Sequence, residues 1–598
     1  MAKRIRIGGG GGFYGDSSVA PRQLIEAGVD YLVMDYLAEA TMSALGHMKS
    51  KHAELGYAMD VVDWIWKENM HRLKETGTKF VTNAGGLNPR ACVARMQAMA
   101  KEAGLSFKIA LIEGDDLMPR VTEFSDAGIS ELYKGDAFPE PDKVVSANAY
   151  FGAQPIAAAL NAGADVVITG RVVDSALTLG PLIHEYGWAD DDWDKLSAGS
   201  LAGHIIECGA QGSGGLFTDW EDVPDWAHIG YPIVEFDADG SFDVCKPDGT
   251  GGLITPPVIA EQILYEVGDP QAYMLPDVVC DFTELKLTQN GDNRVRVTGA
   301  KGYPATGKYK VSLTHADGYR AIAFMPVLGR QAAQKAERQM EAIVTRVEEM
   351  LRDRQMGPFR AKRLEAIGAE ASYGANSQAR DVREVMSKLA VEHDDPRAVE
   401  CFIREWDAPA TSMSVGTTCW FGARAQVMPV NKVFSFLVDT GEVPAKVVMG
   451  DQEIVIEGPA PKTPFQDAMI TRPPTGDIAD VRNDAIEVPL IDLAWARSGD
   501  KGDAFNVGVI ARKPDYLPYI RAALSHDAVM TYFAHEFEGA ANPALDIYEL
   551  PNFHGLNFHL KESLGGGQFA SLRIDPLAKG KAQQLLDFPV RVPKSLVS

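Results

Sequence analysis

Carboxylates and histidines follow several short apolar runs of the sequence, in places where an enzyme could transfer protons. Asp16 follows a run of glycines, Asp174 follows Arg171 in Thr-Gly-Arg-Val-Val-Asp, and His204 and Glu207 stand three residues apart. A carboxylate or an imidazole within reach of a substrate can act as a general acid or base. We therefore predict Asp16, Asp174, His204 and Glu207 as candidate catalytic residues.

Cys208 and His315 are two further candidates. Cys208 precedes the glycine-rich loop Gly209–Gly215, whose backbone amides could bind an oxyanion while the thiol acts as a nucleophile. A buried structural cysteine is the alternative interpretation, because a free thiol usually packs as a small apolar group. His315 follows an alternating apolar run, in Thr-His-Ala-Asp-Gly, and is either an acid–base group or a turn residue.

The first glycines of the chain could hold a dinucleotide. Gly10, Gly12 and Gly15 match the spacing Gly-x-Gly-x-x-Gly. Asp35 ends the next apolar run about 20 residues later, where dinucleotide-binding folds place an acid that binds the ribose. A run of five glycines nevertheless matches this spacing almost automatically, and the residues before Pro21 delay the helix that the motif requires. Nicotinamide or flavin binding is therefore one of several hypotheses.

Other residues could bind the anionic part of a cofactor or a substrate. Arg171 lies just beyond an apolar run and could hold a phosphate or a carboxylate with two parallel hydrogen bonds, or could simply pair with a nearby Asp. Asn83 and Gly85 lie in a similar loop, Asn-Ala-Gly-Gly, and are grouped with the cofactor-binding candidates. Arg497 and Lys501, in Arg-Ser-Gly-Asp-Lys-Gly-Asp, are candidates for binding a substrate anion.

These candidates lie where the strands of an α/β sheet would end. Short apolar runs occupy residues 5–7, 31–34, 79–82, 107–112 and 165–169. Their alternation with helical patterns predicts a mainly parallel, doubly wound (Rossmann-like) sheet in residues 1–190. The loops that follow the runs are residues 8–17, 35–36, 83–88, 113–116 and 170–174. Because ligands bind at the carboxyl ends of parallel strands, these polar or glycine-rich loops predict one shared binding rim.

The rest of the chain predicts two further parts. Residues 191–457 mix glycine-rich turns, alternating strands and a charged helix, and indicate an α+β portion packed on the first part to complete a main domain, 1–457. Residues 458–486 are rich in Pro, Asp and Thr and are the predicted linker. Residues 487–598 contain a separate series of predicted strands and helices. This pattern indicates a compact α+β domain of roughly 110 residues, a usual domain size.

The composition excludes several classes of protein. The 58 Lys and Arg against 82 Asp and Glu give a net charge of −24, and the basic residues do not cluster, so we expect no nucleic-acid partner. The six cysteines contain no Cys-x-x-Cys pair, so we expect neither a disulfide framework nor a metal site. No signal peptide or membrane span is evident. We expect a cytoplasmic protein without a membrane partner, which forms a homo-oligomer.

Several ordered motifs of the sequence resemble those of the acyclic terpene utilisation family (AtuA-type proteins) over nearly the whole chain. The motifs lie at Ile7–Ser17, Thr82–Pro89, Thr169–Ser175, His204–Gly215, Tyr231–Phe236, Pro276–Phe282 and Arg497–Asn506. Residues 487–598 are similar to the ferredoxin-like companion domain of that family. Several motifs in a fixed order are more specific than any one of them.

The resemblance implies an enzyme of branched-chain or acyclic terpenoid acyl-CoA catabolism, with a hydratase or carbon–carbon lyase reaction on a CoA thioester. It implies no settled catalytic residues, and the cofactor is unknown. Two alternatives stay open at this point. One is a nucleotide-dependent, NAD(P)-type oxidoreductase that uses the glycines and Asp35. The other is a non-catalytic partner subunit of an acyl-CoA carboxylase, in which the C-terminal domain is an interaction module.

Overall fold

A computed structural model describes residues 3–418, 424–480, 485–568 and 570–597 of the chain. Its largest sheet has eleven strands in the order β11-β12-β8-β7-β1-β2-β3-β6-β4-β18-β19. The central strands run parallel to one another and are β1 (Ile5–Gly9), β2 (Tyr31–Met34), β3 (Lys79–Thr82), β6 (Val166–Thr169) and β4 (Ile109–Glu113). The flanking strands pair antiparallel and are β7 (Ile233–Phe236), β8 (Phe242–Cys245), β12 (Val295–Thr298), β11 (Lys286–Gln289), β18 (Ala445–Met449) and β19 (Gln452–Ile456).

The large sheet is therefore mixed, whereas the sequence predicts a mainly parallel one. The sequence of each parallel strand is a short continuous apolar run, because both faces of this part of the sheet are buried. The antiparallel strands on either side come from residues 233–298 and 445–456. Nothing in a local apolar pattern shows that strands so far along the chain join the same sheet.

Helices cover both faces of the parallel core. Along β2, Tyr31 and Val33 point to one face and Leu32 and Met34 to the other, as the alternation of side chains along a strand requires. The first face carries α6 (Gln154–Asn161), α7 (Ala176–Tyr186), α8 (Trp193–Ile206) and α9 (Pro256–Leu264). The second carries α1 (Val19–Glu26), α2 (Glu39–Lys51), α3 (Lys67–Thr76) and α4 (Pro89–Glu102). Among the described residues, no helix has both the length and the apolar character to cross a membrane.

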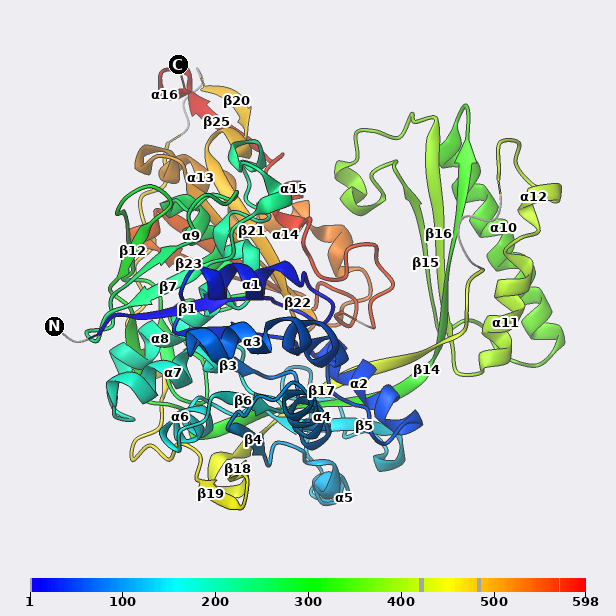
Figure 1. Ribbon diagram of the computed structural model, residues 1–598. Coiled ribbons are helices and arrows are strands. Elements are labelled where there is room, and N and C mark those ends of the chain that lie inside the picture. Colours follow the sequence, from blue (N-terminus) through cyan, green and yellow to red (C-terminus); the bar gives the residue numbers. More distant parts are fainter. Residues whose placement is uncertain (1–2, 419–423, 481–484, 569, 598) are drawn as a thin grey trace.

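A second sheet extends away from the first and forms a separate lobe (Figure 1). Its strands are β15 (Ala361–Ile367), β16 (Glu384–His393), β14 (Lys308–Leu328) and β17 (Met428–Asp439), and β5 (Val144–Ala149) also pairs with β14. The first half of β14 lies beside β5, and the second half supports α10 (Ala332–Asp353) and α11 (Pro396–Glu405). Lys310, near the start of β14, therefore stays with the main body of the protein, where its carbonyl accepts a hydrogen bond from the backbone amide of Tyr150.

The C-terminal part is a four-stranded antiparallel sheet that packs on α9. Its strands are β21 (Ala494–Lys501), β22 (Ala504–Ala511), β24 (Gly555–Lys561) and β23 (Ala544–Leu550), in that order across the sheet. The side-chain amide of Asn506 donates to the Leu264 carbonyl at 2.7 Å, and that of Asn557 donates to the Val267 carbonyl at 2.8 Å. A Cβ on Gly508 would lie 2.6 Å from the Cβ of Leu264, so glycine permits this close approach.

The glycine run at the end of β1 packs against the C-terminal end of α8. A Cβ on Gly9 would lie 2.2 Å from the carbonyl oxygen of Ile206, and one on Gly12 would lie 2.8 Å from the Cα of Cys208. Backbone atoms cannot move aside as the end of a flexible side chain can. The glycines therefore let the two segments touch, and this contact brings Glu207, the residue after α8, beside the strand ends.

We predict that Gly9→Ala lowers the free energy of unfolding by about 1–3 kcal/mol, because the added methyl group overlaps with backbone atoms of Ile206. Gly11→Ala is the matched control, since a Cβ there would first meet the flexible end of Met34, at 3.2 Å. The midpoint of thermal unfolding, measured for both variants and the wild type, checks the prediction. Equal midpoints for the two variants would contradict the packing role of Gly9.

Candidate functional site

Five residues that the sequence singles out lie together at the carboxyl ends of the parallel strands. We call them the strand-end cluster, and they are Asp35, Arg171, Asp174, His204 and Glu207. The charges of Arg171, Asp174 and Glu207 all act on the carboxyl group of Asp35, and His204 contacts Glu207 directly. The structure thus brings together candidates from three separate segments of the chain.

The loops after β3 and β6 lie where the connections of the sheet change direction. After β3 the chain passes to β4, beyond β6, whereas after β6 it passes through α7 and α8 to β7, on the other side of β1. In parallel sheets, loops that leave neighbouring strands in opposite directions border the usual ligand site. Asn83 and Arg171 lie in these two loops, so the cluster is at the place that the topology favours for binding.

Asp35 is a buried carboxyl group, 6 % exposed. Its Oδ1 accepts hydrogen bonds from the side-chain amide of Asn83 at 2.5 Å and from the backbone amide of Leu37 at 3.1 Å. Burial raises the pKa of Asp35 well above its usual value, and the charge of Asp174 adds to this effect, while Arg171 and Asn83 oppose it. Asp35 therefore takes up a proton more readily than an ordinary carboxylate.

Arg171 is held rigidly, and its side chain is 4 % exposed. Its backbone amide donates to Asp115 at 2.8 Å, and its guanidinium donates to Asp174 at 2.7 Å and to the Val172 carbonyl at 2.9 Å. The guanidinium also lies 4.0 Å from the centre of the Tyr150 ring. Its Nε is buried and has no hydrogen-bond partner among the described residues. Arg171 therefore has one unsatisfied donor inside the protein.

Tyr150 and Glu39 lie near Arg171, and Lys310 lies beside both of them. The sequence does not point to any of these three residues. The hydroxyl of Tyr150 donates to Glu39 at 2.8 Å, and Lys310 lies 3.5 Å from the same carboxylate. Although burial acts in the opposite direction, Lys310 and Arg171 lower the pKa of Glu39 to about 2. Three segments far apart in the chain make these contacts, so no short motif could have revealed them.

His204 and Glu207 share one proton. The Nε2 of His204 lies 3.2 Å from the carbonyl oxygen of Ile263, which can only accept, so Nε2 carries a hydrogen. Its Nδ1 lies 3.1 Å from Oε1 of Glu207, so one proton must occupy that contact, either on the nitrogen or on the oxygen. Burial raises the pKa of Glu207 to about 6, although the hydrogen bond with His204 acts against this. Glu207 can therefore gain or lose a proton near neutral pH.

The C-terminal domain contributes Lys501 to this site. Its ammonium group lies 5.5 Å from the centre of the Tyr273 ring and has no ion pair or hydrogen bond within the described residues. Tyr273 and the nearby carboxylates, among them Asp174 and Glu207, hold the pKa of Lys501 above its usual value. Lys501 is thus a charged and exposed side chain beside the strand-end cluster, as its predicted role in anion binding requires.

Arg497 has a different position from the one its predicted role requires. Its guanidinium donates to the Leu216 carbonyl at 2.6 Å and to the side chain of Gln211, and it stacks on Tyr265 at 4.7 Å. These partners belong to the main domain, and Arg497 is 7 % exposed. It therefore joins the two domains and offers little to a substrate anion.

The backbone amides of the three glycines in the Gly-x-Gly-x-x-Gly spacing are already bonded inside the protein. Gly10 donates to the Val33 carbonyl at 2.8 Å, Gly12 to Asp16 at 2.9 Å, and Gly15 to Asp60 at 3.0 Å. A dinucleotide site needs such amides free for the pyrophosphate. These three amides are therefore not free for a pyrophosphate, and Asp16 closes the turn instead of joining the strand-end cluster.

The remaining predicted residues have structural surroundings. Burial raises the pKa of Cys208 well above its usual value, so the thiol is protonated at neutral pH and is a poor nucleophile. A Cβ on Gly85 would lie 2.5 Å from the Thr169 carbonyl, so this glycine lets the loops after β3 and β6 approach each other. His315 lies at a β-bulge in β14, with Asp317 and Lys432 as charged neighbours outside the strand-end cluster.

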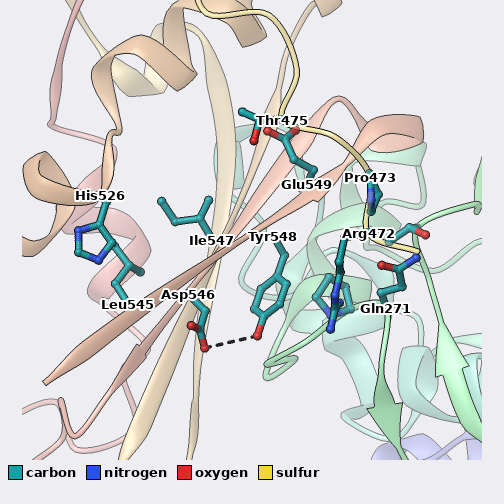
Figure 2. A pocket seen from close by; sticks show the side chains of 12 residues that line it. Gln271, Arg472, Pro473, Thr475, His526, Leu545, Asp546, Ile547, Tyr548 and Glu549 are labelled. Carbon is teal, nitrogen blue, oxygen red and sulfur yellow. Dashed lines mark hydrogen bonds between the residues drawn. The ribbon is translucent and has the colours of Figure 1, made fainter. Parts of the chain in front are cut away.

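A groove of about 470 Å³ lies beside the C-terminal sheet (Figure 2). It is lined by the edge strand β23, the linker and a loop of the main domain, and includes Arg472 and Tyr548 but no residue of the strand-end cluster. Arg472 pairs with Asp269 at 2.5 Å, and Tyr548 donates to Asp546 at 3.4 Å. Within the described part of the chain, His, Cys, Asp and Glu form no group of three that could hold a metal ion.

Comparison with known proteins gives two matches to protein families. The family model described as acyclic terpene utilisation family protein AtuA matches residues 5–449. The model described as AtuA ferredoxin-like domain matches residues 488–591. No curated protein and no solved structure matches the chain.

Asp115, which holds the backbone of Arg171, should make stability depend on pH. It is 4 % exposed, and burial raises its pKa to about 7. The folded state then binds more protons than the unfolded state between about pH 4 and pH 7. The free energy of unfolding therefore falls as pH rises through this range, with a slope of at most about 1.4 kcal/mol for each step of one in pH. We predict that Asp115→Asn removes this part of the pH dependence.

Urea unfolding of the wild type and Asp115→Asn at several pH values between 4 and 8 would measure the difference. Asp116→Asn is the control, because Asp116 is the exposed neighbour of Asp115. Parallel pH profiles for the wild type and Asp115→Asn would show that Asp115 is ionised in the folded protein throughout this range.

Proposed function

We propose, since the chain belongs to the acyclic terpene utilisation family, that its strand-end cluster adds or removes water, or cleaves a carbon–carbon bond, in a branched or terpenoid acyl-CoA thioester. The family membership supports a role in terpene catabolism. The reaction class rests on the arrangement of acids and cations at the strand ends.

One observation carries the proposal: a carboxyl group that can exchange a proton near neutral pH lies beside cations with unused donors. Glu207 shares a proton with His204 and has a pKa of about 6. Lys501 has no partner for its charge within the described residues, and the Nε of Arg171 lacks one as well. Hydration and carbon–carbon cleavage next to a thioester both require a proton transfer and stabilisation of negative charge on the thioester oxygen.

The residues divide these tasks according to their positions. Glu207 is the group that transfers a proton, and the buried His204 holds that proton in place behind it. Lys501, which is exposed, binds the oxygen on which negative charge develops, and the buried charge of Arg171 adds to its stabilisation. Asp174 pairs with Arg171, and its side chain is 38 % exposed, so it is the second carboxylate that a substrate can reach.

We expect Glu207→Gln to lower turnover by about 10²–10⁴-fold, the usual contribution of a general acid or base. The assay incubates the full chain with 3-methylbut-2-enoyl-CoA, as a simple branched thioester, and with β-hydroxy acyl-CoA thioesters in water labelled with heavy oxygen, and follows the products by mass spectrometry. Glu221→Gln, at an exposed position, is the control. Turnover by Glu207→Gln at the wild-type rate would remove Glu207 from the mechanism.

We expect Lys501→Gln to weaken binding of the same thioester by about tenfold or more, because a hydrogen bond to a charged group contributes about 1.5–3 kcal/mol. Lys513→Gln is a matched control: Lys513 is an exposed lysine of the same domain that lies 5.3 Å from the ring of Tyr516. The shift of the unfolding midpoint with thioester concentration gives the affinity. A shift with NAD(P) and none with the thioester would instead favour the oxidoreductase.

A further inference from the structure

We propose that Lys134 and Asp503 form a latch between the two domains that positions Lys501 over the strand-end cluster. Lys134 belongs to the loop 130–137 of the main domain, and Asp503 belongs to the turn between β21 and β22. Their side chains form an ion pair. The role of this pair in ligand binding rests on the proposed function, whereas the contact itself does not.

The loop 130–137 is a preformed support for Lys134. The carboxylate of Glu131 accepts hydrogen bonds from the backbone amides of Tyr133 and Lys134, both at 2.6 Å. The backbone amide of Leu132 donates to the Ser435 carbonyl of β17 at 2.8 Å. The backbone of Lys134 therefore has a fixed position, and its side chain reaches the other domain from there.

The turn that contains Asp503 is held in place by hydrogen bonds within the C-terminal domain. The other carboxylate oxygen of Asp503 accepts a hydrogen bond from the backbone amide of Gly566 at 2.6 Å, and its carbonyl accepts one from Ser563 at 2.9 Å. Lys501 lies two residues before Asp503 on the same tight turn, where Gly502 has a φ of +63°. Movement of Asp503 therefore moves Lys501.

Both ends of the latch lie next to cations of the candidate site. The phenol of Tyr133, the neighbour of Lys134, acts electrostatically on Lys310, and Lys310 and Lys501 act on each other. When Lys134 and Asp503 form their ion pair, the distances from Lys501 to Lys310 and to the strand-end cluster are therefore fixed. Without the pair, Lys501 stays on a folded domain, but its position relative to the main domain is less restricted.

Lys134 is on the surface and Asp503 is partly buried, and an ion pair at the surface adds little to global stability, which separates a positioning role from a structural one. We expect Lys134→Met to change the unfolding midpoint of the full chain by no more than about 2 °C. Hydrogen exchange of the peptides that cover residues 130–137 and 499–505 should become several-fold faster, while β23 stays unchanged. Affinity for 3-methylbut-2-enoyl-CoA should fall about tenfold.

Lys134→Arg keeps the charge and should restore both slow exchange and affinity. Lys143→Met is the matched control, because the ion pair of Lys143 is local, with Glu140 at 3.1 Å. Salt near 1 M screens exposed charges and should accelerate exchange in the wild type but not in Lys134→Met.

Two results would decide against the latch: unchanged exchange at residues 499–505 in Lys134→Met, or equal thioester affinity in Lys134→Met and the wild type. If exchange changes as expected but the wild type itself binds no thioester, the latch stands as a contact that positions Lys501, and the proposed function is the part that fails.

Discussion

The structure around the candidate site depends on one requirement, which is the compensation of the buried charge of Arg171. A buried guanidinium is stable only where nearby groups pair with it or accept its hydrogen bonds. Asp174 supplies the direct partner, Tyr150 supplies a ring face, and Glu39 adds a second negative charge. These groups come from the loop after β6, the residue after β5 and the start of α2, so the requirement fixes three segments relative to one another. Asp115 adds a fourth, because it holds the backbone of Arg171.

The candidate site is shared between two domains, and side chains of both domains make the contact between them. Asn506 and Asn557 donate to carbonyls at the end of α9 and just beyond it, and Gly508 allows the sheet to approach that helix. This packing directs the turn after β21 towards the strand ends. Lys501 lies on that turn. The C-terminal domain therefore supplies a charged side chain to a site whose acids belong to the main domain.

The glycine run has a packing role, which differs from the dinucleotide-binding role that its spacing suggests. The amides of Gly9, Gly10 and Gly12 donate to protein acceptors, and at Gly9 and Gly12 the space that a side chain would fill is taken by the end of α8 and the residues that follow it. The run acts on the site indirectly, because the close contact places Glu207 next to Asp35 and Asp174. The position of a carboxyl group with a raised pKa at the strand ends is a consequence of that packing.

The sequence alone determines the family, the apolar strands of the parallel core and the polar loops that follow them. It also places Arg171 near Asp174 and His204 near Glu207 along the chain, whereas the contacts within these two pairs are seen only in the structure. The tertiary structure alone decides the antiparallel flanks of the sheet, the use of Arg497 as a tie between domains, and the approach of Lys310 and Lys501 to the cluster. The physical reason is distance along the chain: a local pattern encodes contacts within a turn, whereas contacts between distant segments exist only after the domains have packed.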